Sequence, residues 1–243
     1  MSFPQTLTGK YGWEKVTSTA QKQKLGTRMQ IFDREFVYVK AGEAITAGKL
    51  VDGMAGTAAH QVDLAVSAAS AGATTVTLSG SLTITKDQYK DGWLIFNDVE
   101  EEGHMYRIKS NTAVSSATGC VLTLDEEDGL VTAITTSQQV GIYQNPHFEV
   151  EIHDFNDIDH APLGWAVVDI ADESYGWICD KGFTTALIDG TPGIGIALVV
   201  SQGVDGAVEV LDSDADDEGT IVAYMGPIAG VSGEYGLIKA NLG

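Results

Sequence analysis

A run of histidines and carboxylates alternates along one short stretch of the chain. Its members are His147, Glu149, Glu151, His153, Asp154, Asp157, Asp159 and His160. Imidazole and carboxylate together suit zinc, iron or manganese. Alternate residues of a strand lie about 7 Å apart, so one ion cannot contact them all. We predict the polar face of an amphipathic strand here and no metal site. A metal-dependent hydrolase built on residues 147–160 stays an alternative.

Other stretches match ligand-binding loops only in part. Asp212, Asp214 and Asp216 begin like a calcium loop, but Asp217 stands where glycine is needed and Ala223 where glutamate is needed. Residues 190–195 are glycine-rich but lack both the phosphate-loop ending and the dinucleotide fingerprint. No nucleophile, base and orienting group come together in the sequence. We therefore expect no enzymatic activity, no catalytic residue and no cofactor.

The elements that would position these side chains are short strands. Strand-forming stretches alternate with turn signals about every 10–15 residues, the spacing of sandwiches and barrels. They include residues 35–40, 44–51, 74–78, 93–96, 105–109, 121–124, 148–152, 165–168, 176–179, 184–188, 194–200, 207–211, 221–225 and 235–238. The prediction is an all-β protein with a sandwich-like or barrel-like body, a second β module and an extended N-terminal arm.

The strand pattern also suggests a division of the chain. We expect an arm over residues 1–30, a body made of residues 31–56 and 146–243, and a β module inserted at residues 57–145. The chain has 243 residues, of which 44% are hydrophobic, so a core of useful size can be buried.

Cysteines and apolar runs limit the cellular setting. Cys120 and Cys179 are far apart and belong to no zinc or redox motif, so we expect buried free thiols, as in a reducing cytoplasm. No apolar run approaches the ~20 residues that span a bilayer. The first residues also lack the pattern of a signal peptide. We expect no membrane partner.

Charge is the strongest compositional signal. The net charge of −20 argues against nucleic acid as a partner, because phosphate binding needs a positive surface. Residues 1–40 carry seven basic and three acidic side chains, a net charge of +4, whereas the rest carries −24. A basic arm on an acidic body is typical of a segment that docks on something acidic.

The arm also contains large aromatic side chains without a periodic apolar face. These need a covering surface, which either the body of the protein or a partner could provide. The candidate contact residues of the arm are Tyr11, Trp13, Lys10, Lys15, Lys22, Lys24 and Arg28.

Several segments occur in an order found in known proteins. They are LGTR (25–28), FVYVKAGE (36–43), AGKL (47–50), QYKDGW (88–93), GHMYRIK (103–109), APLGWA (161–166) and YGWICDKG (175–182). Together they span most of the chain, and the chain resembles a family of tailed-bacteriophage virion proteins. Some members of that family are capsid decoration, or cement, proteins.

The resemblance implies a structural protein that binds and stabilises the outer surface of a phage capsid. Its expected partners are the major capsid protein and further copies of itself, with a trimer favoured. It would be made in the host bacterial cytoplasm and reside on the virion. A second alternative is a phage tail or receptor-binding accessory protein that recognises host glycans through Trp93 or Trp177.

Overall fold

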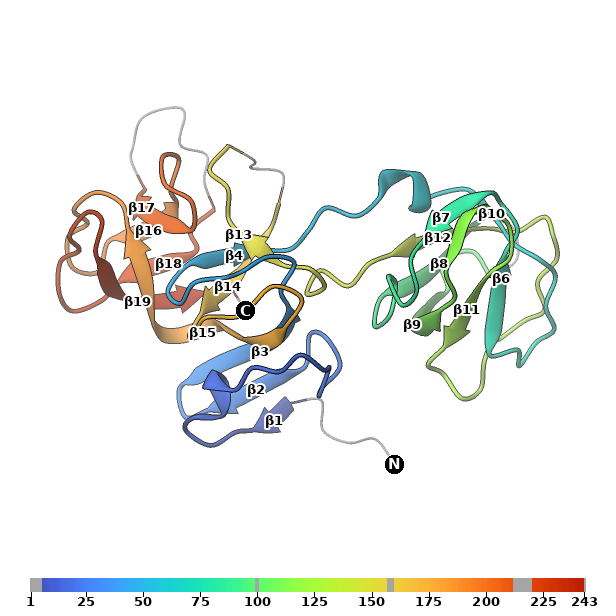
Figure 1. Cartoon of the computed structure of the whole chain (residues 1–243), viewed down its shortest axis with the longest axis horizontal. Coiled ribbons are helices and arrows are strands. Elements are labelled where there is room, and N and C mark those ends of the chain that lie inside the picture. Colours follow the sequence, from blue (N-terminus) through green and yellow to red (C-terminus); the bar gives the residue numbers. More distant parts are fainter. Residues whose placement is uncertain (1–5, 99–100, 157–159, 212–219, 243) are drawn as a thin grey trace. The chain divides into compact units, whose positions relative to one another are not determined.

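A computed structural model describes residues 6–98, 101–156, 160–211 and 220–242. The chain divides into two compact units, a body (Met1–Ala55 with Pro146–Gly243) and a module (Gly56–Asn145). The expected all-β class is confirmed, because the regular elements are strands and two short 3₁₀ turns, η1 (Trp13–Lys15) and η2 (Ala58–His60) (Figure 1).

The body is built on one continuous system of strands. In chain order these are β1 (Thr6–Thr8), β2 (Arg28–Ile31), β3 (Arg34–Lys40), β4 (Leu50–Asp52), β13 (Glu151–Ile152), β14 (Pro162–Ala166), β15 (Tyr175–Ile188), β16 (Ala197–Val200), β17 (Ala207–Val210), β18 (Ala223–Met225) and β19 (Tyr235–Asn241). Their main order is β1-β2-β3-β15-β17-β16-β18-β19. Because β19 also pairs with β15, strands β15 to β19 close into a five-stranded barrel.

The longest strand, β15, belongs to both halves of the body. Its first half pairs with β3 and its second half with β19. The sequence analysis expected two strands here, 176–179 and 184–188, because Asp180 and Lys181 interrupt the apolar pattern. A register shift between Cys179 and Lys181 instead lets one strand continue. Gly182 follows with a φ of +92°, a conformation that glycine adopts without strain.

Alternating side chains fill three apolar clusters in the body. Leu198, Val208 and Ile238 belong to the cluster of the barrel strands. A second cluster joins β3 to β4 and β14 through residues such as Val39 and Val51. The third includes the start of β15 and is the one that receives the N-terminal residues.

The module has its own strands and its own core. They are β5 (Leu64–Ala65), β6 (Thr75–Leu78), β7 (Leu82–Ile84), β8 (Trp93–Asp98), β9 (Met105–Asn111), β10 (Val114–Ala117), β11 (Cys120–Leu124) and β12 (Gln139–Tyr143). Six of them form a sheet in the order β5-β12-β8-β9-β11-β6. A bridge between Val66 and Leu78 brings its two edges together, so this sheet is nearly closed. A separate apolar cluster lies inside it.

Two expected strands are shorter in the structure. Residues 148–152 were expected to alternate as one strand, but only Glu151–Ile152 does so, because Glu149 has a φ of +55°. Of residues 44–51, only the end belongs to β4. In both places apolar residues such as Val150 and Ile45 are buried while the backbone turns beside them, and Phe148 and Ile152 are half-buried.

The N-terminal arm packs on the body, which is one of the two covering surfaces that the sequence left open. β1 pairs in parallel with β2, and Leu25 and Met29 are buried in the third cluster. The sequence pattern missed this because the segment takes most of its apolar contacts from distant strands. We call the described residues 6–30 the N-terminal segment.

Candidate binding surface on the N-terminal segment

Backbone hydrogen bonds fix the N-terminal segment to β3 and β15. The Ser18 N–H donates to the Tyr175 carbonyl at 3.0 Å, and the Tyr175 N–H donates back at 2.8 Å. The N–H groups of Gly26 and Lys22 donate to the carbonyl and hydroxyl oxygens of Tyr38, at 2.9 and 3.0 Å. The segment is thereby held at several points along its length.

A tight turn presents Trp13 at the surface. Gly12 has a φ of +95°, and its N–H donates to the Glu14 carboxylate at 2.7 Å. Glu14 is buried, whereas the next residues on either side are exposed. This turn therefore orients Trp13, which is 48% exposed.

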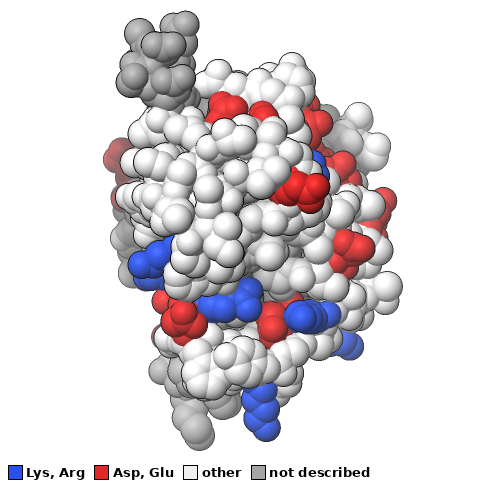
Figure 2. Space-filling view, turned by 90° about the vertical axis from the view of Figure 1, so that its left-hand side faces the viewer, with Lys and Arg blue, Asp and Glu red and all other residues white. Residues whose placement is uncertain are grey.

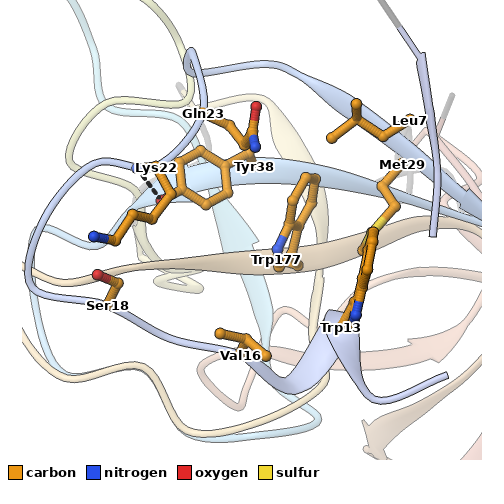
Figure 3. Close-up of a pocket in the computed structure, with 9 residues that line it drawn as sticks. All are labelled: Leu7, Trp13, Val16, Ser18, Lys22, Gln23, Met29, Tyr38 and Trp177. Carbon is orange, nitrogen blue, oxygen red and sulfur yellow. Dashed lines mark hydrogen bonds between the residues drawn. The ribbon is translucent and has the colours of Figure 1, made fainter. Parts of the chain in front are cut away.

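Trp13 stands at the side of an apolar pocket of about 270 Å³. Its lining residues are Leu7, Trp13, Val16, Ser18, Lys22, Gln23, Met29, Tyr38 and Trp177 (Figure 3). Six of the nine come from the N-terminal segment before β2, and the others stand on β2, β3 and β15. The pocket exists only because the segment lies over these strands.

Aromatic packing makes the inner wall of the pocket rigid. The rings of Tyr38 and Trp177 meet edge to face with their centroids 5.0 Å apart, and Tyr175 stacks on Tyr38 at 5.9 Å. Burial raises the pKa of Tyr38 above its usual value of 10.0, although the N–H groups of Lys22 and Gln23 lower it in part. Tyr38 is therefore a neutral hydroxyl at physiological pH.

The N-terminal segment also exposes apolar and basic side chains. Tyr11 is 70% exposed and stacks on Phe32, with centroids 4.9 Å apart. The four lysines predicted as contact residues, Lys10, Lys15, Lys22 and Lys24, are exposed. In Figure 3 the Lys22 ammonium points away from the two indoles. In Figure 2, Lys and Arg gather in the lower part of the view, where the N-terminal segment and β1 to β3 lie in Figure 1.

Arg28 has a different place from the other basic candidates. Its guanidinium lies 2.7 Å from the Asp180 carboxylate and 3.4 Å from that of Glu35. The Asp180 side chain is 3% exposed, and its burial raises its pKa while the charge of Arg28 lowers it. Arg28 therefore compensates a buried charge and serves the fold.

Of the nine pocket residues, only Trp13 and Lys22 belong to the predicted contact set, and the other seven were absent from it. Trp177 was expected as a core or subunit contact or as a sugar-stacking residue, Tyr38 was expected in a strand, and Met29 was expected in the arm. Trp177 is 6% exposed and forms the inner wall of the pocket. Only the pairing of the N-terminal segment with β3 and β15 brings these residues to Trp13, and no local pattern reveals that pairing.

The alternating run at 147–153 is divided among separate structural contacts. His153 Nδ1 lies 2.5 Å from the Asp52 carboxylate, and both side chains are buried. Glu149 pairs with Lys40 at 3.3 Å. Within the described ranges no group of three or more His, Cys, Asp or Glu side chains could hold a metal ion. Asp157, Asp159 and the aspartates at 212–216 lie outside those ranges.

The other side chains singled out from the sequence are mostly covered. The Arg107 guanidinium lies 4.8 Å from the centroid of Trp93, on the face of its ring that a sugar would need. Cys120 and Cys179 are free and buried, as expected. Burial raises the pKa of Cys179 to about 11, so this thiol is protonated and a poor nucleophile at neutral pH.

Comparison of the chain with family models, curated proteins and solved structures gave no match. In the part of the chain that the structure describes, no helix has both the length and the apolar character needed to span a bilayer.

Proposed function

We propose that this chain is a structural protein of a tailed-phage virion, a decoration or cement protein that binds the outer surface of the capsid. Its partners are the major capsid protein and further copies of itself, and a trimer is the favoured assembly. The protein acts without a catalytic centre. It is made in the host bacterial cytoplasm, where its buried thiols stay reduced.

The observation that carries the proposal is the exposed, basic and aromatic surface of the N-terminal segment. Tyr11, Trp13 and Val16 are 70%, 48% and 58% exposed beside an apolar pocket. The same segment exposes four lysines, on a protein whose net charge is −20. Large aromatic side chains at the centre of an interface each contribute about 2 kcal/mol or more to binding. The surrounding lysines would control the encounter rate and its salt dependence.

The architecture supports a structural role. The segment is fixed by hydrogen bonds to β3 and to the start of β15, so little conformational entropy is lost when it meets a partner. Many copies on one shell would also reinforce attachment through multivalency. The resemblance of the sequence segments to phage virion proteins points in the same direction.

The test is binding of the purified protein to undecorated capsids. We expect Trp13→Ala to weaken binding at least tenfold, and the double variant Lys10→Glu/Lys15→Glu to weaken it mainly at low salt. Met105→Ala and Lys109→Glu are matched controls, because both residues are exposed on β9 of the module.

Folding is checked by circular dichroism and thermal unfolding of each variant. Deleting residues 1–24 would remove β1 and uncover the pocket wall, so point variants give the cleaner result. Unchanged capsid binding by folded Trp13→Ala and by the double lysine variant would exclude the N-terminal segment as the attachment surface. Failure of the unmodified protein to bind would overturn the proposal itself.

A further inference from the structure

The barrel strands and the segments that connect them expose many large apolar side chains. Nine of the 17 exposed large hydrophobic residues in the described ranges lie between Phe183 and Leu237. The described residues 175–211 and 220–242 contain seven charged residues in 60, and the acidic side chains of this region are concentrated in residues 212–219 between them. Figure 2, which views the body from the side of β16 to β19, shows a broad area free of charged residues.

The strand register brings part of this apolar surface into one patch. Phe183 on β15 lies opposite Lys239 on β19, Thr185 opposite Leu237, and Leu187 opposite Tyr235. On the other side of β19, Tyr224 lies opposite Lys239. The alternate residues, such as Ala186 and Ile238, are buried in the barrel. We call Phe183, Leu187, Tyr224, Tyr235, Leu237 and Lys239 the barrel face.

Exposure on this scale costs solubility unless the surface has a partner. Phe183, Tyr224, Tyr235 and Leu237 are between 39% and 49% exposed on three adjacent strands. Contiguous apolar patches of this kind mark protein interfaces, whereas single exposed apolar residues do not. Aromatic enrichment and a scarcity of charge are also typical of interface centres.

We infer that the barrel face is the surface through which copies of this chain associate with one another. Two copies with a net charge of −20 repel each other, whereas the only charged residue within the barrel face is basic. Lys239 lies within the face and makes no ion pair with any described residue. A neighbouring acidic copy can supply a carboxylate to Lys239.

This charge pattern favours a cyclic arrangement. In a two-fold contact of the face with itself, Lys239 would meet a face that contains no carboxylate. In a cyclic oligomer, each barrel face would meet a different, acidic surface of the next copy. Such head-to-tail contacts can close into a ring. The inference rests on the proposed function in one respect. Because that proposal assigns capsid attachment to the N-terminal segment, elsewhere on the body, the barrel face is left for contact with another copy.

The test is sedimentation velocity of the full chain, without capsids, over a range of concentrations. We expect the unmodified protein to sediment as more than one copy. Leu237→Asp and Phe183→Asp should each raise the dissociation constant at least tenfold, because both place a carboxylate in the apolar contact. Lys239→Glu should do the same. Val131→Asp is the matched control, since it adds the same charge at a 67% exposed residue of the module.

Circular dichroism identifies any variant that fails to fold, and the conservative Phe183→Ser then replaces it. A monomer at every concentration, or an oligomer that persists in all the folded barrel-face variants, would overturn the inference. Capsid binding lost in Leu237→Asp but retained in Trp13→Ala, with a monomeric unmodified protein, would assign the face to the shell instead. Loss of capsid binding in Trp13→Ala alone concerns the proposed function and leaves this inference standing.

Discussion

At the scale of single residues, Arg28 and Asp180 show how burial changes the role of a charged side chain. The sequence places Arg28 in a basic stretch, where it is one of several equivalent candidates for partner contact. The structure joins it to a carboxylate that is 3% exposed. No local pattern indicates this pairing, because the two residues are 152 positions apart and the register shift in β15 turns Asp180 inward.

We predict that Arg28→Met lowers the free energy of unfolding by about 2 kcal/mol at neutral pH, between the losses typical of exposed and buried ion pairs. Burial raises the pKa of Asp180, so the folded state favours its protonated form more than the unfolded state does. The carboxylate therefore destabilises the fold as pH rises through that raised pKa. The deficit of Arg28→Met should shrink on acidification, since protonation removes the unpaired charge.

Chemical denaturation at several pH values measures this effect. The double variant Arg28→Met/Asp180→Asn should regain most of the lost stability at neutral pH, and Lys15→Met, at an exposed residue, should lose little. A deficit in Arg28→Met that is independent of pH would show that the loss comes from packing of the arginine stem.

At the scale of elements, a buried carboxylate joins a loop of the module to β9. Glu101 accepts hydrogen bonds from the Tyr106 and Thr132 hydroxyls, both at 2.6 Å, from His104 Nδ1 at 2.6 Å, and from the Thr132 N–H. Burial opposes ionisation of Glu101, but these bonds outweigh it and lower its pKa below the usual 4.5. The ionised carboxylate therefore stabilises the module.

Glu101→Gln should destabilise the module by about 2 kcal/mol at neutral pH, the range of hydrogen bonds to charged groups. Because the pKa of Glu101 is lowered on folding, its contribution is present above pH 4.5 and is lost as pH falls through the folded pKa. The unmodified protein and the variant should thus become more alike in acid. Hydrogen exchange of peptides from residues 101–142 measures this, with Glu102→Gln as the exposed control. Equal protection in Glu101→Gln and Glu102→Gln at neutral pH would contradict the prediction.

The local sequence pattern predicted strands correctly where apolar and polar residues alternate along a segment that also pairs with a neighbouring strand. Residues 35–40, 105–109 and 121–124 all lie within observed strands. The same pattern failed at residues 148–152, where Glu149 turns the backbone while Val150 stays buried. Alternation reports which side chains are buried, and it does not report whether the backbone between them stays extended. The pocket was not predictable at all, because its two walls are brought together only by long-range pairing.

At the scale of the whole molecule, the module enters and leaves the body at adjacent points. Asp52 on β4 pairs with Glu151 on β13, and a Cβ on Gly53 would lie 2.7 Å from the Pro146 carbonyl oxygen. The ends of the body that flank the insertion are therefore already close. Closing them with a short linker should cost little entropy.

We predict that replacing residues 56–145 with a short Gly-Ser linker leaves a folded body, and that residues 56–145 alone form a folded β domain. Each unit keeps its own apolar cluster, and no strand pairs across the division. Circular dichroism and NMR dispersion of the two pieces are the measurement. A body that unfolds without the module would show that the two units depend on each other for stability.

The length of β15 has a mechanical consequence. Its first half backs the pocket, its second half forms part of the barrel face, and Lys181 pairs with both Glu35 and Asn241 where the two registers meet. If the shell holds one half and a neighbouring copy holds the other, tension between them runs along a single backbone. The hydrogen bonds to β3 and β19 lie across that direction. Such a load would have to break many of these hydrogen bonds at once instead of one by one. β15 would therefore resist force applied between the shell and the neighbouring copy.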